Sequence, residues 1–271
     1  MTESQKPSAI ILEPEDGWLT IWFNSPDNRN ALTEALIADL ESTLTKVRSD
    51  RSIRGITLRG KGGTFCSGGD LKAFHAGLAG DANPKEIEAM NRRGGEFFHL
   101  VKTMPQVVLA LADGAVIAGG LGLLCCADIV VVTTDTKFAL TETQLGIVPA
   151  QIASYLVQRI GLPKAKHLML TGAKLSGKEA HSIGLANFVV DNENGFGEVE
   201  NNIRKDVIRC APNAIAATKE ILLQSGSLDQ NKMTEFAAQK FAQCLLSSEG
   251  REGILSFMEK RSPSWANGES E

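Results

Sequence analysis

The sequence predicts a mixed α/β fold that passes into a helix-rich C-terminal region. Apolar runs of strand length recur in the first half of the chain, and stretches with helical spacing separate them. The runs at residues 107–112 and 128–133 are apolar throughout, which is typical of strands covered on both faces by helices. Beyond Pro149 the pattern becomes mainly helical.

The elements of the first half follow in order. Residues 18–24, WLTIWFN, are aromatic and β-branched and end at a turn, so they predict a strand. A helix follows, because leucines recur at helical spacing from residue 32 to residue 44. Residues 54–59 predict a short strand. A further helix begins at Pro84, where Asn83 can act as the N-cap.

The second half predicts more helix than strand. A short helix opens at a glycine turn before the strand at 128–133, and a last strand is expected at 185–190. Ser176 and Glu179 form a capping box at the start of one helix. The expected helices cover residues 151–160, 163–171, 176–183, 198–210, 213–224, 230–247 and 249–261.

Composition limits the classes of function. With 271 residues and 43% hydrophobic content, the chain can bury a full core. Its five cysteines lack metal-site spacing, which favours a reducing compartment with buried thiols. The N-terminal residues are polar and acidic, so we expect a cytoplasmic protein. A net charge of −4 without a basic face argues against nucleic acid, and no apolar run has the length of a membrane span.

Two glycine turns carry the chemistry. Ser67-Gly68-Gly69-Asp70 follows a strand and opens a helix, and Gly119-Gly120 opens another. Each turn can present a backbone amide, and two amides aimed at one point form an oxyanion hole. One acidic side chain, Glu142, follows the second turn. Structural interpretations stand beside these: close packing for the glycines, a solvated carboxylate for Glu142 and a helix cap for Asp70.

Six motifs, in order along the chain, resemble the enoyl-CoA hydratase/isomerase (crotonase) superfamily. The resemblance implies a crotonase (ClpP-like) spiral of ββα turns at residues 1–195, holding the acyl-CoA site, and a C-terminal helical trimerisation region at 196–271. It further implies a homotrimer or homohexamer, a coenzyme A thioester as substrate, and no cofactor or metal. The motifs are FNSPDNRNAL at 23–32, FCSGGDLK at 65–72, AGGLGLLCCAD at 118–128, KFALTETQLGIVP at 137–149, LMLTGAKLSGKEAHSIGLANFVV at 168–190 and EGREGILSFMEKR at 249–261.

The resemblance also implies roles for individual residues. The amides of Gly69 and Gly119 would hold the thioester oxygen, and Glu142 would be the catalytic carboxylate. Phe257 and Lys260 would contact the nucleotide end of CoA from a neighbouring subunit. The remaining residues expected to bind the CoA or acyl group are Ser67, Gly68, Asp70, Leu71, Lys72, Gly120 and Gly122.

The sequence departs from the two-glutamate pattern of the family at Gly122, where those members carry the first glutamate. One carboxylate leaves three possibilities open: hydration of an α,β-unsaturated acyl-CoA, a Δ3,Δ2-enoyl-CoA isomerase, or a non-catalytic acyl-CoA binder. The stretch LGIVPAQIASYLVQRIG is similar to bacterial methylglutaconyl-CoA and isohexenylglutaconyl-CoA hydratases. That similarity favours hydration of a branched glutaconyl-CoA ester.

Overall fold

The computed structural model describes residues 8–78 and 83–266. Its larger sheet has six strands, of which only the first pair is antiparallel. The strands lie in the order β1 (Ile10–Glu15), β2 (Trp18–Phe23), β3 (Gly55–Gly60), β4 (Val107–Ala112), β6 (Ile129–Thr133) and β9 (Phe188–Val190).

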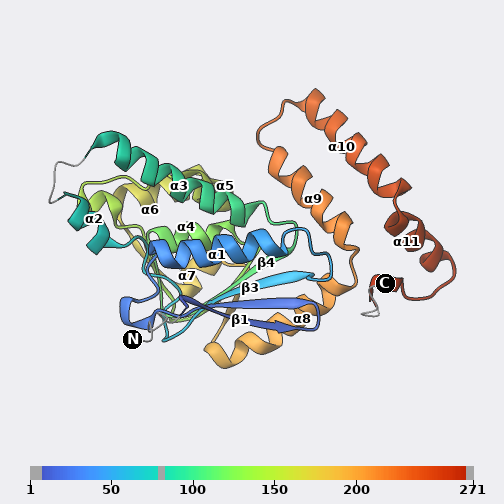
Figure 1. The fold of residues 1–271 in the computed structure, drawn as a ribbon, viewed down its shortest axis with the longest axis horizontal. Helices are drawn as coiled ribbons and strands as arrows, with labels where there is room; N and C mark the ends of the chain where they lie inside the picture. The colour runs from blue at the N-terminus through green and yellow to red at the C-terminus, as the bar shows by residue number, and fades with distance from the viewer. Residues whose placement is uncertain (1–7, 79–82, 267–271) are drawn as a thin grey trace, which may run out of the picture.

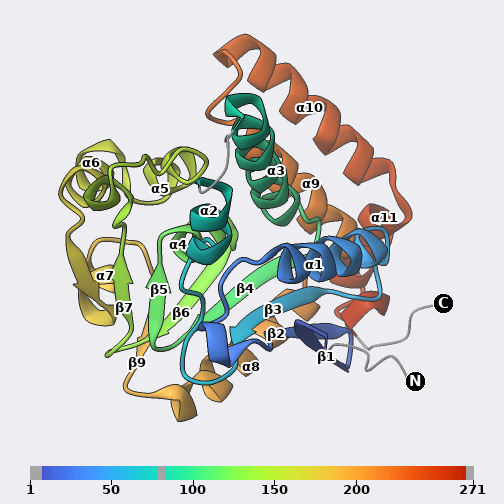
Figure 2. The same ribbon diagram turned by 60° about the vertical axis from the view of Figure 1, so that its left-hand side comes forward.

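A second sheet of three short strands lies beside the first (Figure 2). In it, β5 (Ala115–Ile117) pairs in parallel with β7 (Lys137–Ala139), and β7 pairs antiparallel with β8 (Lys174–Ser176). Because β5 follows β4 after only two residues, the chain passes directly from the large sheet into the small one. This passage brings the second glycine turn close to both sheets.

Helices cover both faces of the large sheet. One face carries α1 (Glu34–Val47), α3 (Pro84–Lys102) and α4 (Gly119–Cys126), and α8 (Phe196–Ile208) lies across the other (Figure 1). The main hydrophobic core fills the first layer. In the second, apolar side chains of α8 pack on outward-facing residues of the strands, namely Trp18, Leu109, Leu111 and Val131.

Other helices and 3₁₀ turns lie in the connections between these elements or after the last of them. They are α2 (Leu71–Leu78), α5 (Ala153–Ile160), α6 (Leu162–Thr171), α7 (Gly177–Ser182) and the short 3₁₀ turns η1 (Pro26–Asn28), η2 (Glu142–Leu145), η3 (Glu193–Gly195) and η4 (Ser264–Ala266). Among them, α5, α6 and α7 lie near the small sheet (Figure 2).

Several sequence predictions are confirmed at the level of local structure. The Asn83 side chain caps α3 by accepting from the Lys85 N–H at 3.0 Å. Ser176 and Glu179 form the expected capping box of α7. The strand predicted at 107–112 is β4, with the same bounds.

Four strands were not predicted: β1, β5, β7 and β8. In β1 only Ile10 is buried, since the strand forms an exposed edge of the sheet, so no apolar alternation marks it. The other three have three residues each. They are held by pairing with distant segments rather than by local propensity.

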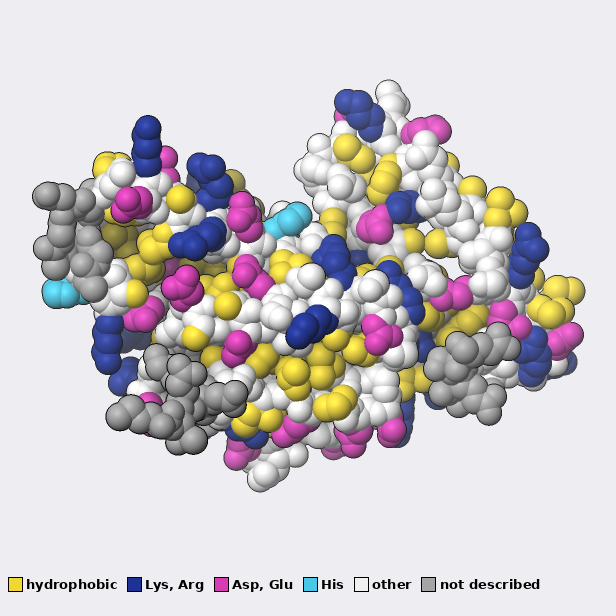
Figure 3. Space-filling model, in the orientation of Figure 1, with side chains coloured by type: hydrophobic (Ala, Val, Ile, Leu, Met, Phe, Trp, Pro, Cys, Tyr) yellow, Lys and Arg dark blue, Asp and Glu magenta, His cyan; other side chains and the backbone are white. Residues whose placement is uncertain are grey.

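The last helices, α9 (Pro212–Gln224), α10 (Gln230–Leu246) and α11 (Ser248–Met258), form an arm that extends from the body (Figure 1). No residue of α10 is buried among those described, and Ala216 and Ser256 are the buried residues of α9 and α11. Hydrophobic side chains are exposed along the arm (Figure 3). The exposed large ones include Phe241, Leu246 and Phe257. The division of the chain at residue 195 stays a prediction.

Two further expectations concern the thiols and the membrane. Cys66, Cys125 and Cys126 are buried as predicted, whereas Cys210 is exposed. Across residues 8–78 and 83–266, no helix combines the length and the apolar character needed to cross a lipid bilayer.

Candidate active site

Three chain segments run side by side and end at one edge of the structure. Cys66 forms a parallel bridge with Val116 of β5, and Val116 is paired with Phe138 of β7. Neighbouring strands lie about 4.8 Å apart, so residues a few positions beyond these partners are close in space. The residues that follow at the ends of the three segments are Gly69, Gly119 and Glu142.

The first glycine turn requires glycine at position 68. Gly68 has φ +94°, and a Cβ there would lie 2.8 Å from the Ile117 carbonyl oxygen and 2.9 Å from Ala118 Cβ. Its own carbonyl accepts a hydrogen bond from the Leu32 N–H at 2.8 Å. The turn is therefore fixed from both sides, with its backbone packed directly against the second glycine turn.

The second turn contains an unusual residue, because Ala118 has φ 48° and ψ −120° without being glycine. Its N–H donates to the Ala139 carbonyl at 2.9 Å, and its carbonyl accepts from Leu121 and Gly122 at the start of α4. Such a conformation costs about 1–3 kcal/mol and persists only where its surroundings hold it. Here it bends the chain from β5 into α4.

The two predicted oxyanion amides are close together. A Cβ built on Gly119 would lie 3.5 Å from the Gly69 nitrogen, and one on Gly68 would lie 3.2 Å from the Gly119 nitrogen. Within the described residues, neither the Gly69 nor the Gly119 N–H donates a hydrogen bond. The structure thus brings together two free backbone donors, one of them at the N-terminus of an apolar helix.

Glu142 is a buried carboxylate with an unpaired oxygen. It begins η2, three residues beyond β7, and its side chain is buried at 7% exposure. Oε2 is inaccessible and receives no hydrogen bond from the described part of the chain. Burial raises the pKa of Glu142 above its usual 4.5, since the charged form loses hydration. The interpretation of Glu142 as a solvated loop carboxylate is wrong.

Gly122 has no room for a side chain. A Cβ there would lie 2.9 Å from Ile152 Cγ1 and 3.2 Å from the ring of Phe98. Both neighbours are buried, and the Phe98 ring makes an edge contact with Tyr155 at 6.1 Å between centroids. Any side chain at position 122 would therefore require these apolar neighbours to shift. Sequence analysis identified Gly122 but missed Ile152 and Phe98.

The residues after the first turn begin α2. The Asp70 carboxylate accepts from the Lys72 and Ala73 N–H groups at 3.0 and 3.2 Å, which confirms its interpretation as a helix cap. Leu71 and Lys72 are exposed, and Ser67 is half-buried with its N–H bonded to the Arg29 carbonyl. Phe74, which sequence analysis missed, lies 3.0 Å from where a Gly69 Cβ would be.

Phe257 and Lys260 lie far from this edge within one chain. Phe257 lies near the end of α11, Lys260 follows two residues after the last residue of that helix, and α11 lies at the opposite side of the molecule from α2 in Figure 1. Phe257 is 85% exposed. Cys125 and Cys126 are buried in α4, and burial raises the pKa of Cys125 to about 12, as expected of core thiols.

Comparison with known proteins decides the family. The model of the enoyl-CoA hydratase/isomerase family matches residues 13–268 of this chain. The chain belongs to that family. It is therefore an enzyme of the enoyl-CoA hydratase/isomerase family.

Solved structures of enoyl-CoA hydratase/isomerase relatives confirm the crotonase fold. Pseudomonas aeruginosa AtuE is 41% identical with a TM-score of 0.92, over 95% of this chain and 99% of that one. An enoyl-CoA hydratase/isomerase from Marinobacter aquaeolei is 37% identical with a TM-score of 0.91, over 95% and 99%.

A curated relative of this enoyl-CoA hydratase/isomerase has a named substrate. Mitochondrial methylglutaconyl-CoA hydratase of Homo sapiens is 28% identical over 269 residues, which is 97% of this chain and 77% of the human one.

Proposed function

We propose that this enzyme adds water reversibly to the double bond of an α,β-unsaturated acyl-CoA with Glu142 as its single catalytic carboxylate. The amides of Gly69 and Gly119 would bind the thioester oxygen and stabilise the enolate as negative charge develops there. The observation that carries the proposal is that three paired segments end at two adjacent amides and one buried carboxylate. Among the described residues, neither amide N–H has a hydrogen-bond acceptor and Glu142 Oε2 has no donor.

One carboxylate is sufficient for both proton transfers. Glu142 would accept a proton from water as the oxygen attacks the β-carbon, and would then give that proton to the α-carbon of the enolate. The electron pair of the double bond moves to the thioester oxygen in the first step and returns in the second. Packing of Ile152 and Phe98 against Gly122 supports this route, because any side chain at position 122 would require these neighbours to shift.

We further propose a branched glutaconyl-CoA ester as the substrate. The stretch at residues 145–161 that follows Glu142 is similar to hydratases of such esters. The human relative named methylglutaconyl-CoA hydratase supports the same substrate class.

Substrate binding is proposed to involve both the glycine turns and a second subunit. Phe257 and Lys260 lie in and just after α11, which belongs to the arm and lies apart from α4 in Figure 1, so we propose that in a homotrimer or homohexamer they contact CoA bound by a neighbour. The other proposed contacts are the backbone of residues 67–72, together with Gly120 and Gly122.

The direct test is hydration of defined thioesters. Crotonyl-CoA and 3-methylglutaconyl-CoA are each incubated with the protein, and loss of the conjugated-thioester absorbance is followed. We expect loss with both and a higher kcat/KM with 3-methylglutaconyl-CoA. If the absorbance stays constant with both substrates, the proposed hydration is contradicted. If kcat/KM is higher with crotonyl-CoA, the proposed substrate is contradicted.

A second reaction is consistent with a single carboxylate. Glu142 could move a proton between two carbons of a 3-enoyl-CoA, as in a Δ3,Δ2-enoyl-CoA isomerase, through the same enolate. The two reactions differ in water uptake. Incubation in H₂¹⁸O labels the product of hydration, whereas isomerisation gives conjugated absorbance with no label. We expect the label.

A further inference from the structure

A charged hollow lies on the face of the large sheet that α8 only partly covers. Its volume is about 380 Å³, close to the lower end of the range of about 300–1,000 Å³ for small-molecule sites. The apolar stripe of α8 packs on Trp18 and the middle strands, which leaves the outer part of β1–β3 open beside it. The hollow is lined by Glu13 and Glu15 of β1, Trp22 of β2, Arg59 of β3, and Glu200 and Arg204 of α8.

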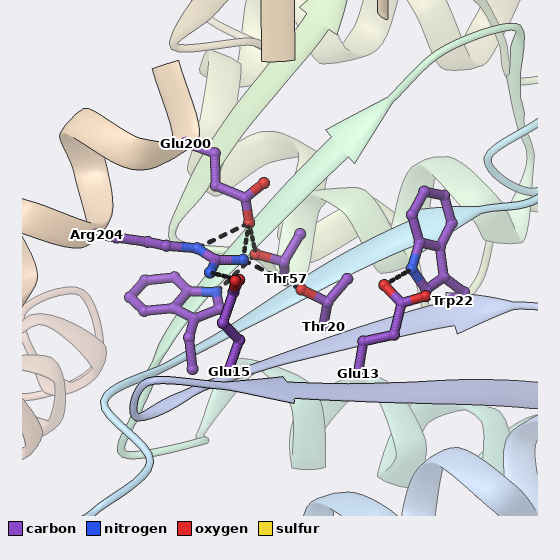
Figure 4. A network of polar contacts seen from close by, with 8 residues as sticks. Glu13, Glu15, Thr20, Trp22, Thr57, Glu200 and Arg204 are labelled. Carbon is purple, nitrogen blue, oxygen red and sulfur yellow. Dashed lines mark hydrogen bonds and ion pairs between the residues drawn. The ribbon is translucent and has the colours of Figure 1, made fainter. Parts of the chain in front are cut away.

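One of the two arginines is fully engaged (Figure 4). Arg204 donates to Glu200 Oε1 at 2.7 Å, to Glu15 Oε2 at 3.0 Å and to the Thr20 hydroxyl at 3.2 Å. Thr57 donates to the same Glu200 oxygen at 2.6 Å and accepts from the Trp18 indole N–H at 2.7 Å. This network anchors α8 to the sheet, so it has a structural function already.

The other arginine, Arg59, has no polar partner among the described residues. The guanidinium of Arg59 lies 4.2 Å from the Trp22 ring centroid and 5.3 Å from that of Phe196. Within residues 8–78 and 83–266, it makes no hydrogen bond or ion pair, and its Nε is buried without a partner. A partly buried charge without hydrogen bonds is costly. Contact with the Trp22 ring holds this donor group at the lining of the hollow.

Free acceptors line the hollow as well. Glu13 accepts from the Trp22 indole N–H at 2.6 Å through Oε2, and Glu15 and Glu200 each use one oxygen for Arg204. The second oxygen of each carboxylate receives no hydrogen bond from a described residue. Among the described residues that line the hollow, Arg59 is thus a cation without a polar partner beside three half-used carboxylates, of which Glu200 is only 8% exposed. Lys61, outside the lining, lies with its Nζ 3.6 Å from the Trp22 ring centroid.

We propose that this hollow binds a small zwitterion of the amino-acid type. Its carboxylate would take the planar donor fork of Arg59, for which a bidentate carboxylate is the natural partner. Its ammonium group would lie among the free oxygens of Glu13, Glu15 and Glu200. A phosphate or other polyanion fits poorly, because the three glutamates outnumber the two arginines of the lining.

The test uses probes that separate the two charges. Glycine, β-alanine and γ-aminobutyrate carry both groups at different spacings, propionate carries the carboxylate alone, and n-propylamine carries the ammonium alone. Isothermal titration calorimetry on the full-length protein should show saturable binding of at least one zwitterion. We expect that zwitterion to bind at least about tenfold more tightly than propionate or n-propylamine.

Variants locate the binding. Arg59→Gln should abolish binding of the zwitterion, and Glu13→Gln should weaken it, while Arg92→Gln, an exposed site on α3, should leave it unchanged. Circular dichroism checks that each variant is folded. No saturable binding by any of the three zwitterions overturns the proposal, as does binding that survives Arg59→Gln. Turnover of enoyl-CoA should be unaffected by Arg59→Gln, so failure here is distinct from failure of the proposed hydratase.

Discussion

Glu142 is held where its charge is disfavoured. Its Oε2 is buried and finds no hydrogen-bond donor in the part of the chain that the structure describes, and loss of hydration raises its pKa. A carboxylate used as a base at neutral pH benefits from this, because proton transfer is most effective when the pKa of the base approaches the working pH. The same burial reduces the free energy of unfolding whenever the group is ionised in the folded protein.

The first prediction is that Glu142→Gln lowers the catalytic activity and raises the thermal stability of the protein. Turnover should fall by about 10²–10⁴-fold, the range associated with general acid–base catalysis. Thermal unfolding should occur at a higher temperature than in the wild type at pH 7. Both are measured on the same preparation, and retained affinity for acyl-CoA shows that the site is intact.

The pH dependence has a definite sign. The unfolded pKa is near 4.5 and the folded pKa is higher, so the wild type loses stability as pH rises through this window. The advantage of Glu142→Gln should therefore be present above the folded pKa and absent below pH 4.5. A variant that is less stable than the wild type at pH 7 would show that Glu142 has a stabilising partner.

The second prediction concerns Gly68, whose φ is +94° and whose Cβ position lies against Ile117 and Ala118. Gly63 is the matched control, since it has φ +65° and nothing within 4 Å of its Cβ position. Gly63→Ala should cost only backbone strain, about 1 kcal/mol or more. Gly68→Ala should cost more and should also lower kcat, because it moves the two amides apart. Urea unfolding measures the stability of each variant, and turnover assays measure kcat. Equal losses of stability in Gly68→Ala and Gly63→Ala would contradict the close contact of position 68 with Ile117 and Ala118.

At the scale of the elements, the packing of α4 on α5 determines how many acids the site can hold. Ile152, just before α5, fills the space above Gly122 of α4. No local sequence pattern predicts the contact between Gly122 and Ile152, because the two positions are thirty residues apart. A glycine at the expected glutamate position was visible in the sequence, whereas its packing partner required the fold.

The third prediction is that Gly122→Ala and Ile152→Ala compensate each other. Gly122→Ala overpacks the contact and should cost about 1–3 kcal/mol. Ile152→Ala leaves a cavity and should cost about 2–5 kcal/mol. The loss of unfolding free energy in the double variant should be smaller than the sum of the two single losses by about 0.5–3 kcal/mol. Urea denaturation gives each value.

The control pairs Gly122→Ala with Leu156→Ala. Leu156 is buried on α5 but is not among the nearest neighbours of the Gly122 Cβ position. That pair should be additive within about 0.5 kcal/mol. If the stability losses of Gly122→Ala and Ile152→Ala are additive, then the two side-chain positions are not in contact.

Local signals and distant pairing explain what the sequence could predict. The cap of α3 at Asn83 and the capping box of α7 depend on residues a few positions apart, so they were predicted correctly. The glycine turns were predicted for the same reason. Convergence of Gly69, Gly119 and Glu142 depends on the bridge between Cys66 and Val116 and on the pairing of β5 with β7, which no local pattern encodes. It was expected only through the family resemblance.

At the scale of the whole molecule, the arm differs from the body. It is joined to the body partly by Lys219 of α9, which donates to the Asp128 carboxylate and to the Gln106 carbonyl. Otherwise α9–α11 contribute few buried side chains, while Leu222, Phe241 and Leu246 are each at least 65% exposed. Exposed apolar area of this kind marks a protein interface.

The fourth prediction is that the arm mediates the proposed trimer. Phe241→Glu should shift the protein toward monomers in sedimentation velocity, because a charge cannot be buried in an apolar contact without a partner. Lys178→Glu, on α7 away from the arm, is the control and should not change the sedimentation coefficient. An unchanged distribution in Phe241→Glu would place the interface elsewhere.

A helix that buries none of its own residues has little to hold it in an isolated chain. If the apolar side chains of α10 are buried only against neighbouring copies of the chain, then the folded fraction of α10 depends on protein concentration through mass action. Dilution should melt the arm before the sheets, and amide hydrogens of residues 230–246 should exchange faster as the protein concentration falls. The thermal unfolding temperature of this enzyme would then rise with protein concentration.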